Sequence, residues 1–317
     1  MPEIGYWLSS EEHPPLDLVA HARAAEEAGF THALISDHFH PWVDEQGHSA
    51  MVWATIGGIA QATERLQLGT AVTCPLIRTH PAIVAQAAAT AASMLPGRFI
   101  LGLGTGENLN EHILGDRWPS GPVRLEMLRE AIEVIRLLWQ GGSRSHHGKH
   151  YTVEEARIYT LPDELPPIAV AAAKPGAARL AGENDALINV SPDEEIVREF
   201  RSAGGEGKPI HGQVTVCWHE SESEARKIAH RIWPNAGVKG ELSQELPLPR
   251  HFEQASEMVT EDEIAELIPC GPDPEPVAES IQQFLDAGFD HVYVHQVGPD
   301  QKGFVEFAQR ELVPRFV

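Results

Sequence analysis

Short apolar runs alternate with longer amphipathic stretches along the chain. An apolar run of roughly four to eight residues is typical of a buried strand, whereas apolar positions three and four residues apart are typical of a helix. Strands are expected at residues 4–8, 32–36, 66–72, 99–104, 168–173, 186–190, 213–218 and 291–295. Helices are expected at residues 16–29, 51–63, 81–95, 123–140, 176–182, 193–204, 276–287 and 303–310.

Two stretches interrupt this alternation. Residues 141–167 are rich in His, Gly and turn residues and include a hairpin-like segment at 149–153, while residues 233–261 contain Pro and Gly without a regular period. Strand–helix pairs of this number in a chain of 317 residues predict a single-domain (β/α)8 TIM barrel with two irregular insertions. A doubly wound sheet is the alternative, but the first strand–helix turn lacks the Gly-x-Gly-x-x-Gly of its dinucleotide-binding form.

Composition argues against several classes of partner and site. The formal net charge is −22, so neither nucleic acid nor an anionic membrane surface is an expected partner. No apolar run reaches the roughly 18 residues that span a bilayer, and the first residues do not resemble a signal peptide. The 3 cysteines and 17 histidines form no zinc-like spacing, so no metal site is expected. We expect a cytoplasmic protein.

The carboxyl ends of the expected strands should form one rim, which is where barrel enzymes place their chemistry. The fourth strand runs into Gly104-Thr105-Gly106-Glu107, where glycines allow close backbone approach to a ligand and backbone N–H groups can hold an anion. The other ends on this rim are 9–11, 37–42, 69–75 and 171–176. A ligand site is therefore expected at this end of the barrel.

Two residues of the rim form a candidate acid–base pair. His38 follows Asp37 and can accept a proton at neutral pH, while Glu107 provides a carboxylic acid on another strand end. A base and an acid on opposite sides of a flat ligand would suit hydride transfer. His40 is a rival for the base, and Trp42 is either a core residue or the wall of an aromatic pocket.

Three ordered motifs resemble the bacterial luciferase-like superfamily. They occupy residues 36–42, 68–72 and 102–111, and they are most similar to the coenzyme F420 (deazaflavin)-dependent glucose-6-phosphate dehydrogenase group. The resemblance runs from residue 5 to about 186 and returns at 273–316. It implies a (β/α)8 barrel, usually a homodimer, that holds F420 in its mouth and acts on an alcohol or sugar.

The resemblance also implies roles for individual residues. His38 would be the base on the alcohol and Glu107 the acid towards the ring nitrogen, with Trp42 lining the reaction site and Glu11 near the substrate. Asp37 would contact the ring. A non-proline cis peptide is expected at Ala71–Val72, behind the ring. The rest of the cofactor would be held by Thr105, Gly106, Asn110, Ala173, Lys174 and Gly176.

The substrate-facing half departs from the sugar-phosphate enzymes. Ser191-Pro192-Asp193 stands where they have a Lys, and Glu266-Leu267-Ile268-Pro269 where they have an Arg. A phosphate dianion needs charge-assisted donors, so Lys174, Lys239 or Arg250 would have to substitute for them. The substrate therefore stays open between an alcohol, a sugar and a sugar phosphate. The alternatives are an FMN-dependent monooxygenase and a non-catalytic binding protein on the same fold.

Overall fold

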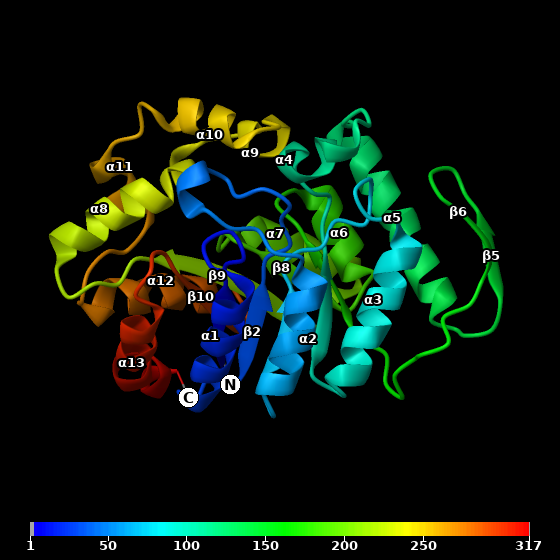
Figure 1. The fold of residues 1–317 in the computed structure, drawn as a ribbon, viewed down its shortest axis with the longest axis horizontal. Coiled ribbons are helices and arrows are strands. Elements are labelled where there is room, and N and C mark those ends of the chain that lie inside the picture. The colour runs from blue at the N-terminus through cyan, green and yellow to red at the C-terminus, as the bar shows by residue number, and fades with distance from the viewer. Residues whose placement is uncertain (1–2, 317) are drawn as a thin grey trace.

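Eight parallel strands form a closed barrel in the computed structural model, which describes residues 3–316 (Figure 1). They are β1 (Glu3–Leu8), β2 (His32–Ile35), β3 (Gln67–Thr70), β4 (Phe99–Leu103), β7 (Ile168–Ala171), β8 (Ala186–Asn189), β9 (Ile210–Val216) and β10 (His291–Gln296). Each strand pairs with its neighbour in chain order, and β10 pairs with β1 to close the barrel. The predicted strands and the (β/α)8 architecture are confirmed.

Helices surround the barrel as the alternation predicted. They are α1 (Pro15–Glu27), α2 (Val52–Ala62), α3 (Pro81–Met94), α5 (Gly121–Leu138), α6 (Pro175–Gly182), α7 (Glu194–Phe200), α12 (Pro274–Asp286) and α13 (Gln301–Glu311). A further helix, α8 (Glu222–Ile232), follows β9 and was not predicted. Its buried face consists of Ala225, Ala229 and Ile232 among many charged residues, so it shows little apolar periodicity.

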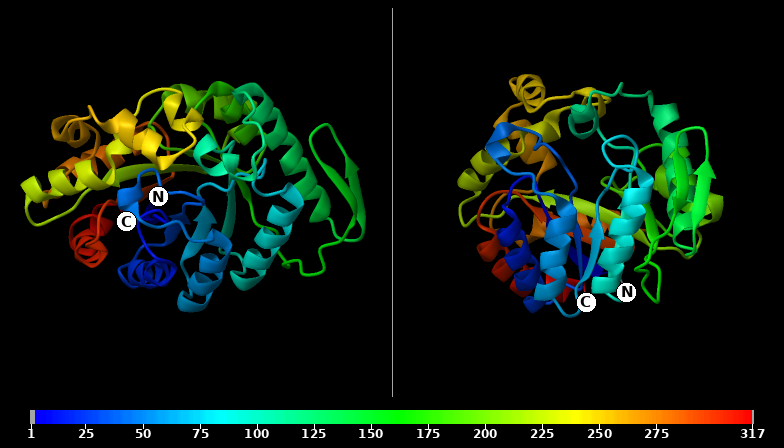
Figure 2. Two further views of the ribbon diagram at one scale, coloured as in Figure 1. Left: turned by 45° about the horizontal axis from the view of Figure 1, so that its top comes forward. Right: turned by 45° about the vertical axis from the view of Figure 1, so that its right-hand side comes forward.

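The first insertion contains an antiparallel hairpin of β5 (Arg144–His147) and β6 (Thr152–Ala156). The hairpin stands beside α5, outside the ring of barrel helices (Figure 2). Glu130 of α5 anchors its turn by accepting hydrogen bonds from the backbone N–H groups of His150 (3.0 Å) and Tyr151 (2.8 Å). The hydroxyl of the buried Tyr151 donates to the carbonyls of Pro75 and Leu76 at 3.2 Å, so this turn also supports the loop after β3.

The second insertion is helical and lies over the carboxyl-terminal end of the barrel. It contains η4 (Pro234–Gly237), α9 (Leu242–Glu245) and α10 (Pro249–Ser256), and α11 (Glu261–Leu267) follows it. Figure 1 shows α9 beside α4 (Asn108–Glu111), the short helix after β4. The Asn108 side chain donates to the backbone carbonyl of Glu245 at 3.0 Å. The insertion therefore covers part of the rim.

Several histidines of the barrel are buried. Burial lowers the pKa of His13 and of His32 to about 4, and it holds the pKa of His211 well below its usual value. These imidazoles are neutral at pH 7. Among residues 3–316, no helix is long and apolar enough to cross a membrane.

We predict that Gly102→Ala destabilises the barrel by more than about 3 kcal/mol, the upper range for overpacking. A Cβ at Gly102 would lie 1.9 Å from the backbone carbonyl oxygen of Thr70. The Thr70 hydroxyl donates to the carbonyl of Gly102 (2.8 Å) and accepts from its N–H (3.1 Å). Moving the two strands apart to make room for a Cβ would therefore break these hydrogen bonds. Urea unfolding measures the change. Gly121→Ala is the control, because its Cβ meets nothing closer than 3.9 Å; equal stability of the two variants would contradict the packing.

We also predict that acid weakens the fold between about pH 6.5 and pH 4. The unfolded chain binds more protons than the folded one in this window, since the pKa of His13 is lower in the folded state. The free energy of unfolding therefore falls on acidification, by up to about 1.4 kcal/mol per pH unit for each such group. Urea unfolding at a series of pH values measures the free energy of unfolding as a function of pH. His13→Gln should make this dependence shallower below about pH 6.5, and above about pH 7 its curve should run parallel to that of the wild type. Identical slopes in acid would refute the assignment.

Candidate active site

The predicted residues of the first four strand ends share the carboxyl-terminal rim of the barrel. Glu11 follows β1, the segment 37–42 follows β2, the segment 71–73 follows β3, and residues 104–110 follow β4. Hydrogen bonds between these loops fix their relative positions. The predicted site residues after β7 lie on the same rim but belong to a separate turn.

Asp37 is held by two partners. The Thr73 hydroxyl donates to one carboxylate oxygen at 2.7 Å, and Nη2 of Arg78 donates to the other at 2.9 Å. Burial disfavours the charge of Arg78, but Asp37 and Glu111 outweigh this effect and raise the pKa of the guanidinium. Both oxygens of Asp37 thus have protein partners, and its contact with a cofactor ring stays a prediction.

Arg78 joins three loops of the rim. Besides Asp37, its Nε lies 3.4 Å from Oε1 of the buried Glu111 in α4, whose other oxygen accepts the backbone N–H of Arg78 at 2.8 Å. Burial raises the pKa of Glu111, while its bonds to Arg78 act in the opposite direction. Neither residue was assigned a role from the sequence, because nothing in their local spacing indicates an ion pair between different loops.

His38 has a contact at each ring nitrogen. Its Nδ1 lies 3.2 Å from the backbone carbonyl oxygen of His40, which can only accept, so we assign the proton to Nδ1. Its Nε2 lies 3.4 Å from Oε1 of Glu11. Glu11 is itself buried and accepts hydrogen bonds from the hydroxyls of Ser36 and Ser9. The Glu11 carboxylate therefore faces His38 from the barrel interior.

Trp42 forms an aromatic contact between His38 and the insertion. Its ring centroid is 4.9 Å from that of His38 and 5.1 Å from that of Phe252 in α10, the latter edge-on at 77°. The rival base His40 is oriented differently: its Nδ1 lies 2.9 Å from the carbonyl oxygen of Leu109, and its ring stacks on His112. Trp42 thus lies over His38, whereas His40 turns towards α4.

Asn110 connects Glu107 to the loop of His38. Its Nδ2 donates to Oε2 of Glu107 at 3.3 Å, and its Oδ1 accepts the backbone N–H groups of Phe39 (2.8 Å) and His40 (3.2 Å). Glu107 precedes the first residue of α4 and is half-buried. The structure therefore places the predicted acid and the predicted base on loops that one buried amide joins.

The end of β3 contains the expected cis peptide bond between Ala71 and Val72. Ala71, Val72 and Ala171 of β7 are half-buried, so small apolar side chains stay open at the mouth. Thr105 and Gly106 follow on the next loop and are half-buried as well. Gly106 has a φ of +69°, and a Cβ there would lie 2.5 Å from Sγ of Cys74, so this position requires glycine.

The turn after β7 is more exposed. Ala173 and Lys174 are exposed, and Gly176 lies in the first turn of α6. Nζ of Lys174 pairs with Oε1 of Glu241 in the insertion at 3.0 Å. The contribution of this turn to cofactor binding stays a prediction.

Comparisons with known proteins agree with this geometry. Residues 1–291 match the family model for luciferase-like monooxygenases. F420-dependent glucose-6-phosphate dehydrogenases of Microbacterium testaceum and Nocardia farcinica are each 34% identical to this chain, over 98% and 99% of it and 96% and 97% of their own lengths. An F420-dependent secondary alcohol dehydrogenase, solved in complex with an F420–acetone adduct, matches with a TM-score of 0.90 and 30% identity over 98% of both chains.

More distant structures share the fold. The F420-dependent tetrahydromethanopterin reductase of Methanopyrus kandleri matches with a TM-score of 0.80 at 22% identity, over 100% of this chain and 99% of its own. The barrel, its motifs and the family model all lead to the same assignment: this chain belongs to the luciferase-like monooxygenase family.

Proposed function

We propose that this protein is an F420-dependent dehydrogenase that transfers a hydride between the C–OH carbon of an alcohol or sugar and the deazaflavin ring. The observation that carries the proposal is the loop network that holds His38, Trp42 and Glu107 around the mouth. The relatives named as F420-dependent glucose-6-phosphate dehydrogenases and secondary alcohol dehydrogenase support the cofactor and the CH–OH class.

The mouth fits a flat heteroaromatic ring. Ala71, Val72 and Ala171 leave an apolar surface of small side chains, on which a ring can lie without steric conflict. The adjacent backbone at Thr105 and Gly106 is partly open, as close approach by a ribityl or phosphate group requires. When bound, F420 supplies the ring carbon that accepts or returns the hydride.

His38 acts as the base in this proposal. With the proton on Nδ1, Nε2 carries the lone pair that removes the hydroxyl proton of the alcohol. The carboxylate of Glu11, 3.4 Å from Nε2, stabilises the imidazolium that results. Glu11 was expected near the substrate; its burial makes it a positioning residue that acts through His38. The reverse step returns the same proton during carbonyl reduction.

Glu107 acts as the acid towards the ring nitrogen. The bond from Asn110 Nδ2 orients its carboxyl group, and its half-buried position leaves one side open to the mouth. Trp42, which contacts both His38 and the buried Phe252, adds apolar surface beside the base. Exclusion of water there strengthens the interactions of the acid and the base with their reacting partners.

The charges of the rim favour a neutral alcohol over a sugar phosphate. Lys174 is paired with Glu241, and Arg78 is neutralised by Asp37 and Glu111. Lys239 and Arg250, the other suggested substitutes, are both exposed residues of the insertion. The charge of Lys239 acts on Glu263, and Arg250 lies on α10.

The segment after β8 offers no replacement for the missing cations. Asp193 there caps α7 by accepting the backbone N–H groups of Glu195 and Ile196. A homodimer, a cytoplasmic location and one barrel domain spanning residues 1–317 remain predictions.

We predict that the purified protein binds F420 with a Kd below roughly 100 μM. His38→Ala and Glu107→Gln should retain this binding, because both side chains transfer protons and are not needed to bind the cofactor. Turnover should fall about 100- to 10,000-fold, the usual effect of removing a general acid or base. Fluorescence titration with oxidised F420 and steady-state loss of its absorbance measure the two effects.

His40→Gln is the matched control for the base. Its ring is already engaged by Leu109 and His112, so turnover should fall less than in His38→Gln. The assignment of the base fails if the His40 variant loses as much turnover as the His38 variant. Preferential binding of FMN with oxygen-dependent turnover would replace the proposal by an FMN-dependent monooxygenase.

We further predict that 2-propanol is oxidised with a kcat/KM at least about tenfold above that for glucose 6-phosphate, since each missing charge-assisted hydrogen bond costs roughly 1.5–3 kcal/mol. Ser191→Lys should raise kcat/KM for glucose 6-phosphate and leave that for 2-propanol unchanged, because Ser191 is exposed just after β8. A wild-type preference for glucose 6-phosphate would overturn this choice of substrate.

A further inference from the structure

The amino-terminal end of the barrel, opposite the candidate active site, holds a cluster of histidines. His32 opens β2, His291 opens β10, and His211 lies near the start of β9. Strand register sets Glu3 beside His291 and His291 beside His211, and it sets His32 beside Gly5. Four strand starts thus bring three imidazoles and one carboxylate together.

Three members of this cluster have the spacing of a metal site. One ligand atom each from Glu3, His32 and His291 lie within 4.8 Å of one another, and Nδ1 of His32 is 2.8 Å from Oε2 of Glu3. Ligands of a tetrahedral Zn²⁺ with bonds of about 2.0–2.1 Å lie about 3.3 Å apart. The carboxylate of Glu3 is 42% exposed and also accepts the Thr31 hydroxyl at 2.7 Å, so a side-chain rotation that releases this bond is needed to close the remaining gap.

The cluster contains ring nitrogens that no other group in residues 3–316 satisfies. Nδ1 of His291 and Nε2 of His211 are buried without a hydrogen-bond partner. Buried polar atoms are normally satisfied, so these orphaned nitrogens are a separate indication of a missing partner.

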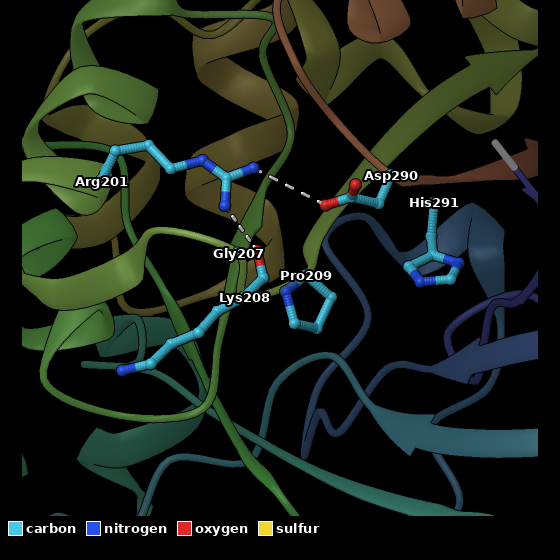
Figure 3. A pocket seen from close by; sticks show the side chains of 6 residues that line it. All are labelled: Arg201, Gly207, Lys208, Pro209, Asp290 and His291. Atoms are coloured by element: carbon cyan, nitrogen blue, oxygen red, sulfur yellow. Dashed lines mark hydrogen bonds and ion pairs between the residues drawn. The ribbon is translucent and has the colours of Figure 1, made fainter. Parts of the chain in front are cut away.

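Solvent reaches the cluster from one side. His291 lines a pocket of about 290 Å³. Figure 3 shows Arg201 on the other side of this pocket from His291. Arg201 pairs with Asp290 at 3.8 Å in this pocket and donates to the carbonyls of Gly205 and Lys208, while Lys208 donates to the carbonyl of Gly182. Asp290 is balanced by Arg201, so the negative charge beside His291 that a cation site requires comes from Glu3.

We propose that Glu3, His32 and His291 bind a divalent transition-metal ion of the Zn²⁺ type. Water from the pocket completes the coordination, and the stacked ring of His211, with centroids 4.8 Å apart, supports His291. Since the ligands come from β1, β2 and β10, the ion ties the first two strands to the last across the closure of the barrel. This inference does not depend on the proposed function, and it revises the sequence-based expectation of no metal site.

The test uses the tag-free full chain, stripped with EDTA and titrated with ZnCl₂ and CoCl₂. We expect one Zn²⁺ per chain, a higher melting temperature with Zn²⁺, and visible Co²⁺ absorption bands typical of four-coordinate nitrogen and oxygen ligation. His291→Gln and Glu3→Gln should each weaken binding at least about tenfold, given that even residues supporting a ligand contribute about 10- to 100-fold. Glu3→Gln keeps an acceptor for the hydroxyl of Thr31, so folding should persist.

His147→Gln is the matched control, because it removes an exposed His–Glu pair on the hairpin that has no third ligand. It should bind Zn²⁺ and shift its melting temperature like the wild type. The proposal is overturned if the wild type binds no Zn²⁺, or if Glu3→Gln binds it as tightly as the wild type and His147→Gln do. Turnover with F420 serves as a separate readout and should be equal in wild type and Glu3→Gln.

Discussion

The candidate active site depends on one buried cation. Arg78 lies between Asp37 and Glu111, with side-chain exposures of 12%, 7% and 0%, and so joins the loops after β2, β3 and β4. Burying such charges is expensive, and removing one partner leaves the others uncompensated at a cost of about 3–5 kcal/mol. The arrangement specifies one geometry for the rim rather than adding much stability.

The consequences of that geometry extend to the reacting groups. Asp37 precedes His38 directly, and Glu111 ends the helix that Glu107 precedes, so the ion pairs fix the backbone beside both the proposed base and the proposed acid. Asn110 supplies a second link between the same loops. A site held by several such bonds changes little when a ligand arrives, which reduces the free energy lost on ordering it.

Much of this could be predicted from sequence because it is local. Eight apolar runs gave the strands, and three motifs gave the family, the cis peptide and the His38 and Glu107 loops. The charged helix α8 and the helices of residues 233–267 carry too little apolar period to be found that way. Arg78, the inward orientation of Glu11 and the cluster around His291 depend on contacts between distant strands, which appear only once the barrel has closed.

The closure of the barrel has a consequence for how the chain is made. β1 must pair with β10, yet β10 leaves the ribosome after the other seven barrel strands. During synthesis β1 is therefore an unpaired edge, with its apolar residues covered only on the side of β2 and α1. The nascent chain can aggregate through β1 until β10 has been synthesised and pairs with it. The sequence of β1 is therefore constrained during synthesis as well as in the folded protein.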